Sequence, residues 1–216
     1  MSTGIMTSTK KATLLHPAYF GSIAQFVAIA NADQILFEDQ DNYQKQTYRN
    51  RTYIYGANGR LLLTIPIKHS QDNRRQLYRD IRIENDFEWQ KLHWRSLETA
   101  YRTSPFFEFY EDELLPLFEK KKEFLLDFNY ETLEVVADCL QLDLSYQKTD
   151  HYKKEVTEHR DLRSLIIAKN EKHELASYNQ VFQDKHGSLK NLSILDLIFN
   201  EGTNALTYLE EQSIAL

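Results

Sequence analysis

Two polar segments contain the residue types that could perform chemistry. His16 directly follows an apolar run and precedes a proline, and an imidazole titrates near neutrality, as a general acid or base requires. Between residues 38 and 51 the chain has no aliphatic side chain, and Asp39, Lys45 and Arg51 give this polar loop both signs of charge. Carboxylate, ammonium and guanidinium groups in one loop suit the orientation of a sugar or a phosphate.

Each segment also has a plainer interpretation. His16 would then cap its own loop through the backbone, and the polar loop would be a solvated loop with internal ion pairs. Three aromatic side chains favour a loop that packs onto the protein, namely Phe37, Tyr43 and Tyr48. Lys68 and His69 follow Pro66 and are expected to face the same loop. From these residues we predict catalytic roles for His16, Asp39 and His69 and substrate contacts from Tyr43, Lys45, Arg51 and Lys68.

Composition excludes several other functions. The chain contains no P-loop, Gly-x-Gly-x-x-Gly, Gly-x-Ser-x-Gly or His-Glu-x-x-His motif, and its seven histidines show no metal-ligand spacing, so we predict no metal site and cannot name a cofactor. The single cysteine, Cys139, lies in an apolar helical pattern where its thiol pKa should rise, which argues against a nucleophile. No segment has the length of apolar sequence that a signal peptide or a membrane span needs, so we expect a cytoplasmic protein.

The net charge of −6 argues against a general nucleic-acid binder. Basic residues nevertheless cluster in the first half of the chain, where they can attract an anionic small molecule. A solvated surface is the alternative. The cluster consists of Arg49, Arg51, Arg60, Lys68, Arg74, Arg75, Arg79 and Arg82.

The elements that must position these residues begin with a strand, a helix and a strand. Apolar residues fill 12–15 and 35–37, and they recur at helical spacing over 23–30. A crossover of this kind makes the two strands parallel, so the loops that follow them meet at the carboxyl edge of the sheet. We therefore expect the His16 loop and the polar loop to be neighbours in space.

A β-hairpin and a helical half should follow. Asn58-Gly59 predicts the turn between strands over 52–55 and 61–65, and alternating apolar residues predict a short strand over 81–83. Helices are predicted over 87–102, from Ser104 through Phe109, over about 111–124 and 130–140, and from the N-cap Ser193 to Gly202. Residues 148–173 are charge-rich and indicate a polar arm that is a linker or partly disordered.

The predicted fold class is thus α/β, with an N-terminal strand-helix-strand unit and a β-hairpin followed by a helical C-terminal half. We expect a disordered start at 1–10 and a single domain over 11–216.

Residues 14–54 and 57–69 resemble the start of the WbqC-like family. That family has a strand leading into His-Gln-Pro-x-Tyr, a Gly-containing helix, an Ala-Asp pair, an acidic loop with Lys and Asn-Arg, and a Leu-Thr-x-Pro strand. Two departures concern the first loop, which lacks the glutamine and has Phe20-Gly21 where a second proline is expected. Including later stretches, the resemblance spans most of 12–208. The matching residues are His16, Pro17, Tyr19, Gly21, Ala32-Asp33, Asp39, Lys45, Asn50-Arg51, Leu63-Thr64 and Pro66.

The resemblance adds Tyr19 and Asn50 to the predicted substrate contacts. It also implies a role in bacterial surface-polysaccharide biosynthesis of the O-antigen type, with transfer of an acyl or aminoacyl group onto an amino sugar as the leading expectation. Our first hypothesis is therefore a transferase acting on a sugar or sugar-nucleotide. A non-catalytic binding or scaffold protein of the same pathway is the second, using the aromatic helices over 89–110, and a nucleotidyltransferase-like enzyme is the third. The expected partners are a small-molecule ligand, a second copy of the chain or a pathway enzyme, with no nucleic acid and no membrane span.

Overall fold

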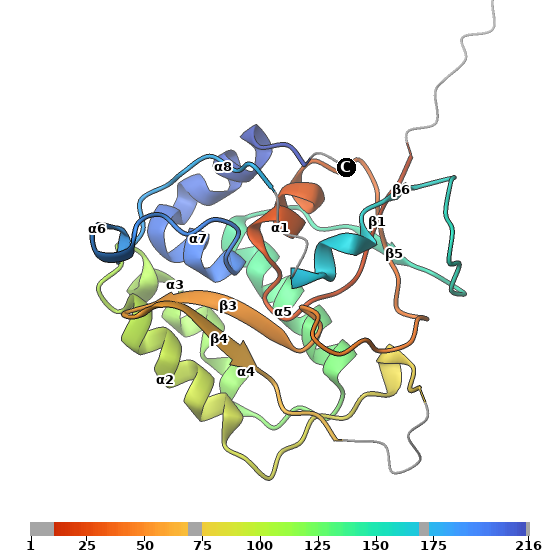
Figure 1. The fold of residues 1–216 in the computed structure, drawn as a ribbon, viewed down its shortest axis with the longest axis horizontal. Coiled ribbons are helices and arrows are strands. Elements are labelled where there is room, and N and C mark those ends of the chain that lie inside the picture. Colours follow the sequence, from red (N-terminus) through yellow and green to blue (C-terminus); the bar gives the residue numbers. More distant parts are fainter. Residues whose placement is uncertain (1–10, 69–74, 169–172, 215–216) are drawn as a thin grey trace, which may run out of the picture.

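The computed structural model describes residues 11–68, 75–168 and 173–214. The start that we expect to be disordered, 1–10, lies outside this range, as does His69. Figure 1 shows a parallel sheet on one side of the molecule and a separate hairpin on the other, with helices around both. The strands are β1 (Thr13–Leu15), β2 (Ile35–Phe37), β3 (Arg51–Gly56), β4 (Gly59–Thr64), β5 (Tyr146–Lys148) and β6 (Arg160–Asp161). The helices are α1 (Ile23–Ala30), η1 (Tyr78–Asp80), α2 (Trp89–Tyr101), α3 (Phe107–Leu114), α4 (Pro116–Glu119), α5 (Leu125–Leu140), η2 (Arg163–Ile166), α6 (Gln183–His186), α7 (Ile194–Glu201), η4 (Gly202–Asn204) and α8 (Ala205–Glu211).

The predicted strand-helix-strand unit is confirmed. β1 and β2 pair in parallel, with Leu14 opposite Leu36, and α1 connects them. The complete sheet has the order β5-β2-β1-β6, and all of its pairs are parallel. The two outer strands have three and two residues and no apolar alternation, which is why the sequence pattern does not reveal them.

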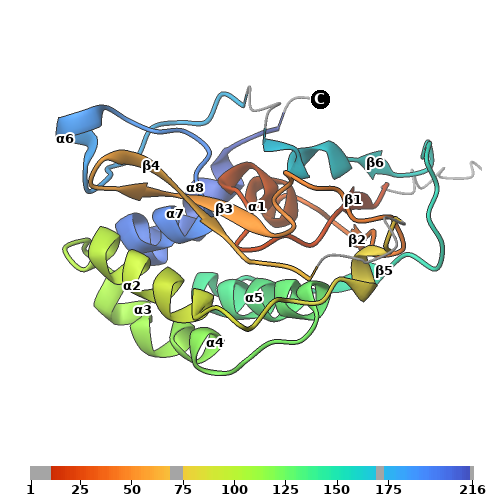
Figure 2. The ribbon, with the colours of Figure 1, turned by 60° about the horizontal axis from the view of Figure 1, so that its bottom comes forward.

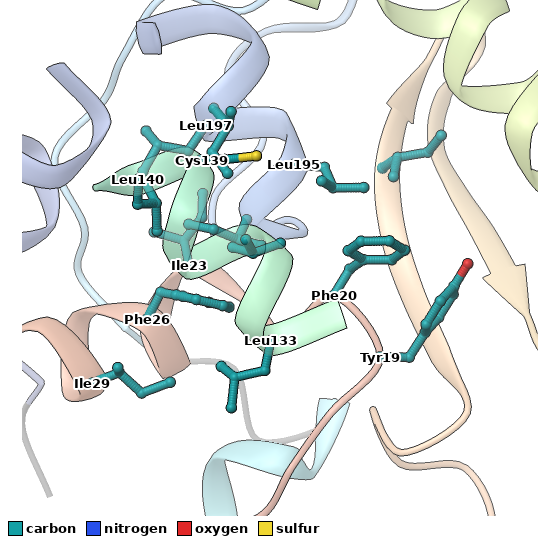
Figure 3. Packing of buried hydrophobic residues seen from close by; sticks show 14 of the residues in the cluster. Tyr19, Phe20, Ile23, Phe26, Ile29, Leu133, Cys139, Leu140, Leu195 and Leu197 are labelled. Carbon is teal, nitrogen blue, oxygen red and sulfur yellow. The ribbon is translucent and has the colours of Figure 1, made fainter. Parts of the chain in front are cut away.

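Helix α1 lies in the apolar core because all of its residues except Gln25 are apolar. All residues from Ile23 to Ile29 are buried, and the helix begins at Ser22, whose hydroxyl accepts a hydrogen bond from the backbone N–H of Gln25. Helices α7 and α8 pack against α1, and α5 packs against α7. Figure 3 shows the side chains of α1, α5 and α7 meeting around Cys139, whose pKa burial raises to about 12, as expected for an inert thiol.

The hairpin and the helix beside it also follow the prediction. β3 and β4 pair antiparallel from Arg51 opposite Thr64 to Gly56 opposite Gly59, and Gly59 adopts the positive φ that the tight turn needs. Helix α2 packs on β3, where the Tyr101 hydroxyl accepts a hydrogen bond from the Tyr55 backbone N–H at 2.9 Å. Figure 2 shows α2, α3, α4 and α5 forming a layer beneath the hairpin.

Two predicted elements are wrong. Residues 81–83 form no strand, because Arg82 and Ile83 each make only an isolated bridge, to Phe124 and Ile67. The helix predicted over 111–124 is instead the end of α3, then α4 beginning at Pro116, then extended chain before α5. Pro116 has no N–H to donate to the preceding turn, so α3 ends before it. The same residue suits the first position of a new helix, where that N–H is not needed.

Part of the predicted polar arm over 148–173 belongs to the sheet and the core. Arg160 pairs with Thr13 of β1, and Leu162 and Ile166 are buried. The loop from Asp150 to Glu158 is mostly exposed, as its charge suggests. The arm thus begins at the carboxyl end of β5 and returns to the sheet as β6. Because β6 is also a parallel strand, the chain reaches the carboxyl edge a second time after β6.

Candidate functional site

His16 lies at the carboxyl end of β1, and its imidazole is held on both sides. Nδ1 is 3.1 Å from the carbonyl oxygen of Glu38, so this nitrogen carries the proton of a neutral ring. Nε2 is 3.2 Å from Nη2 of Arg49, which donates to it. Burial, and then the nearby Arg49 charge, lower the pKa of His16 well below its usual value. The ring is therefore neutral at physiological pH.

Arg49 and Asp41 form a buried ion pair behind His16. Arg49 is fully buried, its Nη2 donates to Oδ2 of Asp41 at 2.5 Å, and its guanidinium lies over the ring of Tyr78. Burial raises the pKa of Asp41 to about 6, although Arg49 opposes the shift. The second oxygen of this carboxylate, Oδ1, is buried and has no hydrogen-bond partner among the described residues.

A second buried arginine completes the edge of the sheet. Arg163 follows β6 and forms two hydrogen bonds with the carboxylate of Asp161, through Nε at 2.9 Å and through Nη2 at 2.6 Å. Its Nη1 and Nη2 also donate to the carbonyls of Lys153 and Lys154, respectively. The carboxylate of Glu38, which is 1% exposed, lies 3.7 Å from Nη1 of Arg163.

His16, Asp41, Asp161 and Arg163 line a cavity of about 340 Å³, which we call the sheet-edge cavity. It opens where the loops after β1, β2 and β6 meet, as predicted for the loops that follow β1 and β2. Its polar lining consists of His16, Asp41, Gln44, Tyr152, Asp161, Arg163 and Ser164.

On the other side of the polar loop, beside the hairpin, lies a larger cleft of about 560 Å³, the hairpin cleft. Three parts of the chain line it: the polar loop, the hairpin with the residues after it, and the segment before α2. Five of the predicted substrate contacts meet here, namely Tyr43, Lys45, Asn50, Arg51 and Lys68, together with Glu84 and Phe87.

The hairpin cleft is cationic. Lys45, Arg51 and Lys68 line it against one carboxylate, Glu84, and none of the three cations forms an ion pair with a described residue. The Nε of Arg51 is buried without a hydrogen-bond partner in the described structure. An anionic group entering the cleft would therefore meet positive charge that is not paired with a carboxylate among the described residues.

Two further features suit this cleft to a polar ligand. Asn50 is 5% exposed; its Nδ2 donates to the Ile65 carbonyl at 2.9 Å, which leaves its buried Oδ1 without a partner in the described structure. Gln46, at the tip of the loop, has a φ of 62°, a conformation that is uncommon outside glycine. Such backbone conformations are often found at functional sites.

Two predicted site residues lie in neither cavity. Tyr19 is fully buried, and its hydroxyl is 2.9 Å from Nδ1 of His93, which is buried and hydrogen-bonded as expected for a core histidine. Asp39 is 6% exposed and accepts hydrogen bonds from Gln40 at 2.7 Å and from the Tyr130 hydroxyl at 3.3 Å. A third candidate, His69, lies outside the described residues.

The first loop departs from the family pattern at a strained position. Phe20 has a φ of 42° and is buried, and its carbonyl accepts hydrogen bonds from the hydroxyls of Thr52 and Ser193, both at 3.0 Å. Gly21 follows, and a Cβ there would lie 2.4 Å from Oε1 of Gln25. The bend is thus held by packing and two side-chain hydrogen bonds.

Sequence reasoning gave no role in the site to Glu38, Asp41 or Arg163, and it named Arg49 only as part of a basic cluster and not as a buried partner of Asp41. For Glu38, Asp41 and Arg49 a signal existed, because they lie in the polar loop directly after β2, whose carboxyl end was expected to bind ligands. Arg163 had no such signal, since β6 itself was not predicted.

Neither metal binding nor membrane insertion is indicated by the described part of the chain. Within residues 11–68, 75–168 and 173–214, no three or more His, Cys, Asp or Glu side chains are arranged to hold a metal ion. The helices of the same residues are too short or too polar to cross a bilayer.

Comparisons with known proteins bear on this site. An uncharacterized protein of Mycobacterium tuberculosis, Rv1507c, is 29% identical over 109 residues, which cover 50% of this chain and 46% of that protein. The chain thus spans about half the length of this curated relative. No solved structure matches. The model of the WbqC-like protein family matches residues 16–176, which include the described linings of both cavities from His16 to Ile167. Because this match covers well over half of the sequence, the chain belongs to the WbqC-like protein family.

Proposed function

We propose that this chain is a cytoplasmic transferase of bacterial surface-polysaccharide biosynthesis, and that it binds the phosphate groups of a sugar phosphate or sugar-nucleotide in the hairpin cleft. The observation that carries the proposal is the convergence of Lys45, Arg51 and Lys68 in one cleft without ion-pair partners among the described residues. The link to polysaccharide rests on the family resemblance. The choice of an anionic ligand rests on the charge of the cleft.

In this proposal each residue of the hairpin cleft has a role. Arg51 can form two parallel hydrogen bonds with a phosphate, while the lysines act as point charges. The free Oδ1 of Asn50 accepts a hydrogen bond from a sugar hydroxyl, and the exposed ring of Phe87 can pack on a base or a sugar. Negative charge that develops on a departing phosphate would be stabilised by the same cations.

Proton transfer belongs in this proposal to His16 or His69. His16 is neutral, and a substrate that recruits its Nε2 has to displace the hydrogen bond from Arg49. Asp39 has the role of positioning the side chain of Gln40 in this proposal. Its carboxylate accepts a hydrogen bond from Gln40, whose own side chain accepts one from Arg79 at 2.7 Å.

The test is a calorimetric titration with UDP-glucose and with inorganic pyrophosphate. Replacing Arg51 by glutamine removes the charge and keeps most of the size, and loss of one charge-assisted contact, worth about 1.5–3 kcal/mol, predicts roughly 10- to 100-fold weaker binding of both probes. Arg95→Gln is the matched control, since Arg95 is an exposed cation of α2 that does not line the hairpin cleft. Equal affinities of wild type and Arg51→Gln would contradict the proposal.

A second candidate function is a binding or scaffold protein of the same pathway. Phe87, Leu92 and Phe109 lie in or beside α2 and α3 and are 66%, 62% and 65% exposed, more than apolar side chains of this size usually are. This function predicts a stable complex with a polysaccharide enzyme and no turnover by the chain alone. Replacing Leu92 and Phe109 by serine would then abolish the complex and leave UDP-glucose binding unchanged.

A further inference from the structure

The order of the parallel strands singles out one position along the sheet. From β1 the chain proceeds to β2 and then β5 on one side, whereas β6 adds to the other side of β1. The strand order therefore reverses between β1 and β6. In open parallel sheets, ligands bind outside the carboxyl ends of the strands at this point of reversal. The sheet-edge cavity lies there, with His16 after β1 and Arg163 after β6 in its lining.

One residue in the lining of this cavity, Asp41, carries an unsatisfied acceptor. The side chain of Asp41 is 5% exposed, and only its Oδ2 has a described partner, Arg49. A buried polar atom without a hydrogen bond destabilises the folded state, by about 1–3 kcal/mol and more for a charged group. A ligand that donates a hydrogen bond to Oδ1 would remove this cost.

The arginines beside the cavity are largely engaged; the Nε of Arg49 has no hydrogen-bond partner in the described structure, but Arg49 does not line the cavity. Arg163 binds Asp161 and two backbone carbonyls, and Arg49 binds Asp41 and His16. Glu38 adds a third carboxylate to those of Asp41 and Asp161, which is one more than the two arginines can neutralise. The cavity therefore disfavours an anion, in contrast to the hairpin cleft, and favours a positively charged donor.

We propose that the sheet-edge cavity binds the primary ammonium group of a small ligand of monosaccharide size, with Oδ1 of Asp41 as its acceptor. The volume of about 340 Å³ lies at the lower end of small-molecule pockets, roughly 300–1,000 Å³. The ammonium group donates to Oδ1, and Gln44 and Ser164, which are both exposed in the lining, are placed to contact the rest of the ligand. The inference rests on the proposed function in one respect only, namely that this ligand is the second substrate of the transferase.

The probe is D-glucosamine, titrated into the full chain near pH 7.5 and followed by protein-observed NMR. D-Glucose is the neutral control, because it has the same shape with a hydroxyl in place of the ammonium group. We expect D-glucosamine to bind at least tenfold more tightly than D-glucose. Equal binding of the two sugars, or no binding of D-glucosamine up to tens of millimolar, would overturn the proposal.

Two variants locate the binding. Asp41→Asn removes the acceptor charge, but it also leaves Arg49 without its counter-charge and can weaken the fold. Ser164→Trp avoids this difficulty, since Ser164 is exposed, makes no side-chain hydrogen bond to a described residue, and would fill the cavity with an indole. We expect both changes to abolish D-glucosamine binding, and unchanged binding in folded Ser164→Trp would refute the site.

The outcome is separable from that of the proposed function. Arg51→Gln should weaken UDP-glucose binding and leave D-glucosamine binding unchanged, whereas Ser164→Trp should do the reverse. Loss of both ligands in both variants would mean one shared site and would overturn the separate ammonium site. If the chain bound D-glucosamine but not UDP-glucose, this would support the ammonium site and refute the proposed binding of a sugar-nucleotide in the hairpin cleft.

Discussion

Charge burial dominates the energetics of individual residues near the sheet edge. Arg49 is fully buried, and its replacement by alanine leaves the Asp41 carboxylate in the interior without its counter-charge. We expect this change to lower the free energy of unfolding by about 3–5 kcal/mol, measured by urea denaturation. Arg82→Ala is the control, because Arg82 and Glu123 form an ion pair whose side chains are 55% and 64% exposed, and such pairs contribute less than about 1 kcal/mol. Similar losses in the two variants would contradict this account.

The raised pKa of Asp41 predicts a pH effect of definite sign. The folded-state pKa is about 6 against an ordinary value of 3.8, so the folded protein binds more protons than the unfolded chain between these values. The group therefore destabilises the fold most above pH 6, and the cost is relieved as the pH falls toward 4. Other groups titrate as well, so the measurement compares wild type with Asp41→Asn. Between pH 7 and pH 5 wild type should gain stability relative to the variant, and parallel profiles would show that the pKa is not raised.

The same residues show what the sequence can and cannot reveal about a site. The polar loop is conspicuous because it lacks aliphatic side chains, and five of its predicted contacts and neighbours line one cleft. Asp41 and Arg49 belong to that loop, and no local sequence pattern separates them from its exposed polar residues, such as Gln44 and Lys45. Only the fold decides which charges of a polar loop become buried, since burial depends on partners distant in sequence such as Tyr78 and Asn129.

At the scale of elements, prediction succeeded where a segment carries its own signal. The apolar runs of β1 and β2, the Asn-Gly turn of the hairpin, and Ser193 and Gly202 at the ends of α7 are local features, and all four elements are present. β5 and β6 have no local signal because their pairing, and not their side chains, makes them strands. The sequence therefore predicts half of the parallel sheet and one of the two walls of the sheet-edge cavity.

The end of α7 supplies a test at this scale. Gly202 has a φ of 55°, and a Cβ there would lie 2.5 Å from the ring of Phe106, whereas Gly187 has a φ of 75° and open space around it. Alanine should strain the backbone at both positions, but only at Gly202 should it also displace an aromatic ring. We expect Gly202→Ala to lower the melting temperature by several degrees more than Gly187→Ala, and equal effects would rule out the steric contribution.

At the scale of the whole molecule, the family match ends before a part of the core. The matched region stops at residue 176, yet Leu195, Ile198 and Phe199 of α7 are fully buried, and Asp196 is hydrogen-bonded to Tyr101 of α2 at 2.6 Å. A chain ending at 176 would expose the faces of α1 and α5 that α7 covers. We expect it to give no cooperative thermal transition, whereas a chain ending at 214 should retain the wild-type transition. A folded 1–176 chain would contradict this expectation.

The late position of β6 has a consequence for synthesis. Thr13 emerges early from the ribosome, but its partner Arg160 follows only after most of the chain has been made. A nascent chain can pair β1 with β2 and form the polar loop. The other edge of β1 has no partner until the hairpin and five helices have been translated. Contacts so distant in sequence form slowly, and an open strand edge invites pairing with other chains. The pocket beside His16 is thus among the last parts of the molecule to form, because its lining residues Asp161, Arg163 and Ser164 are translated only after residue 160.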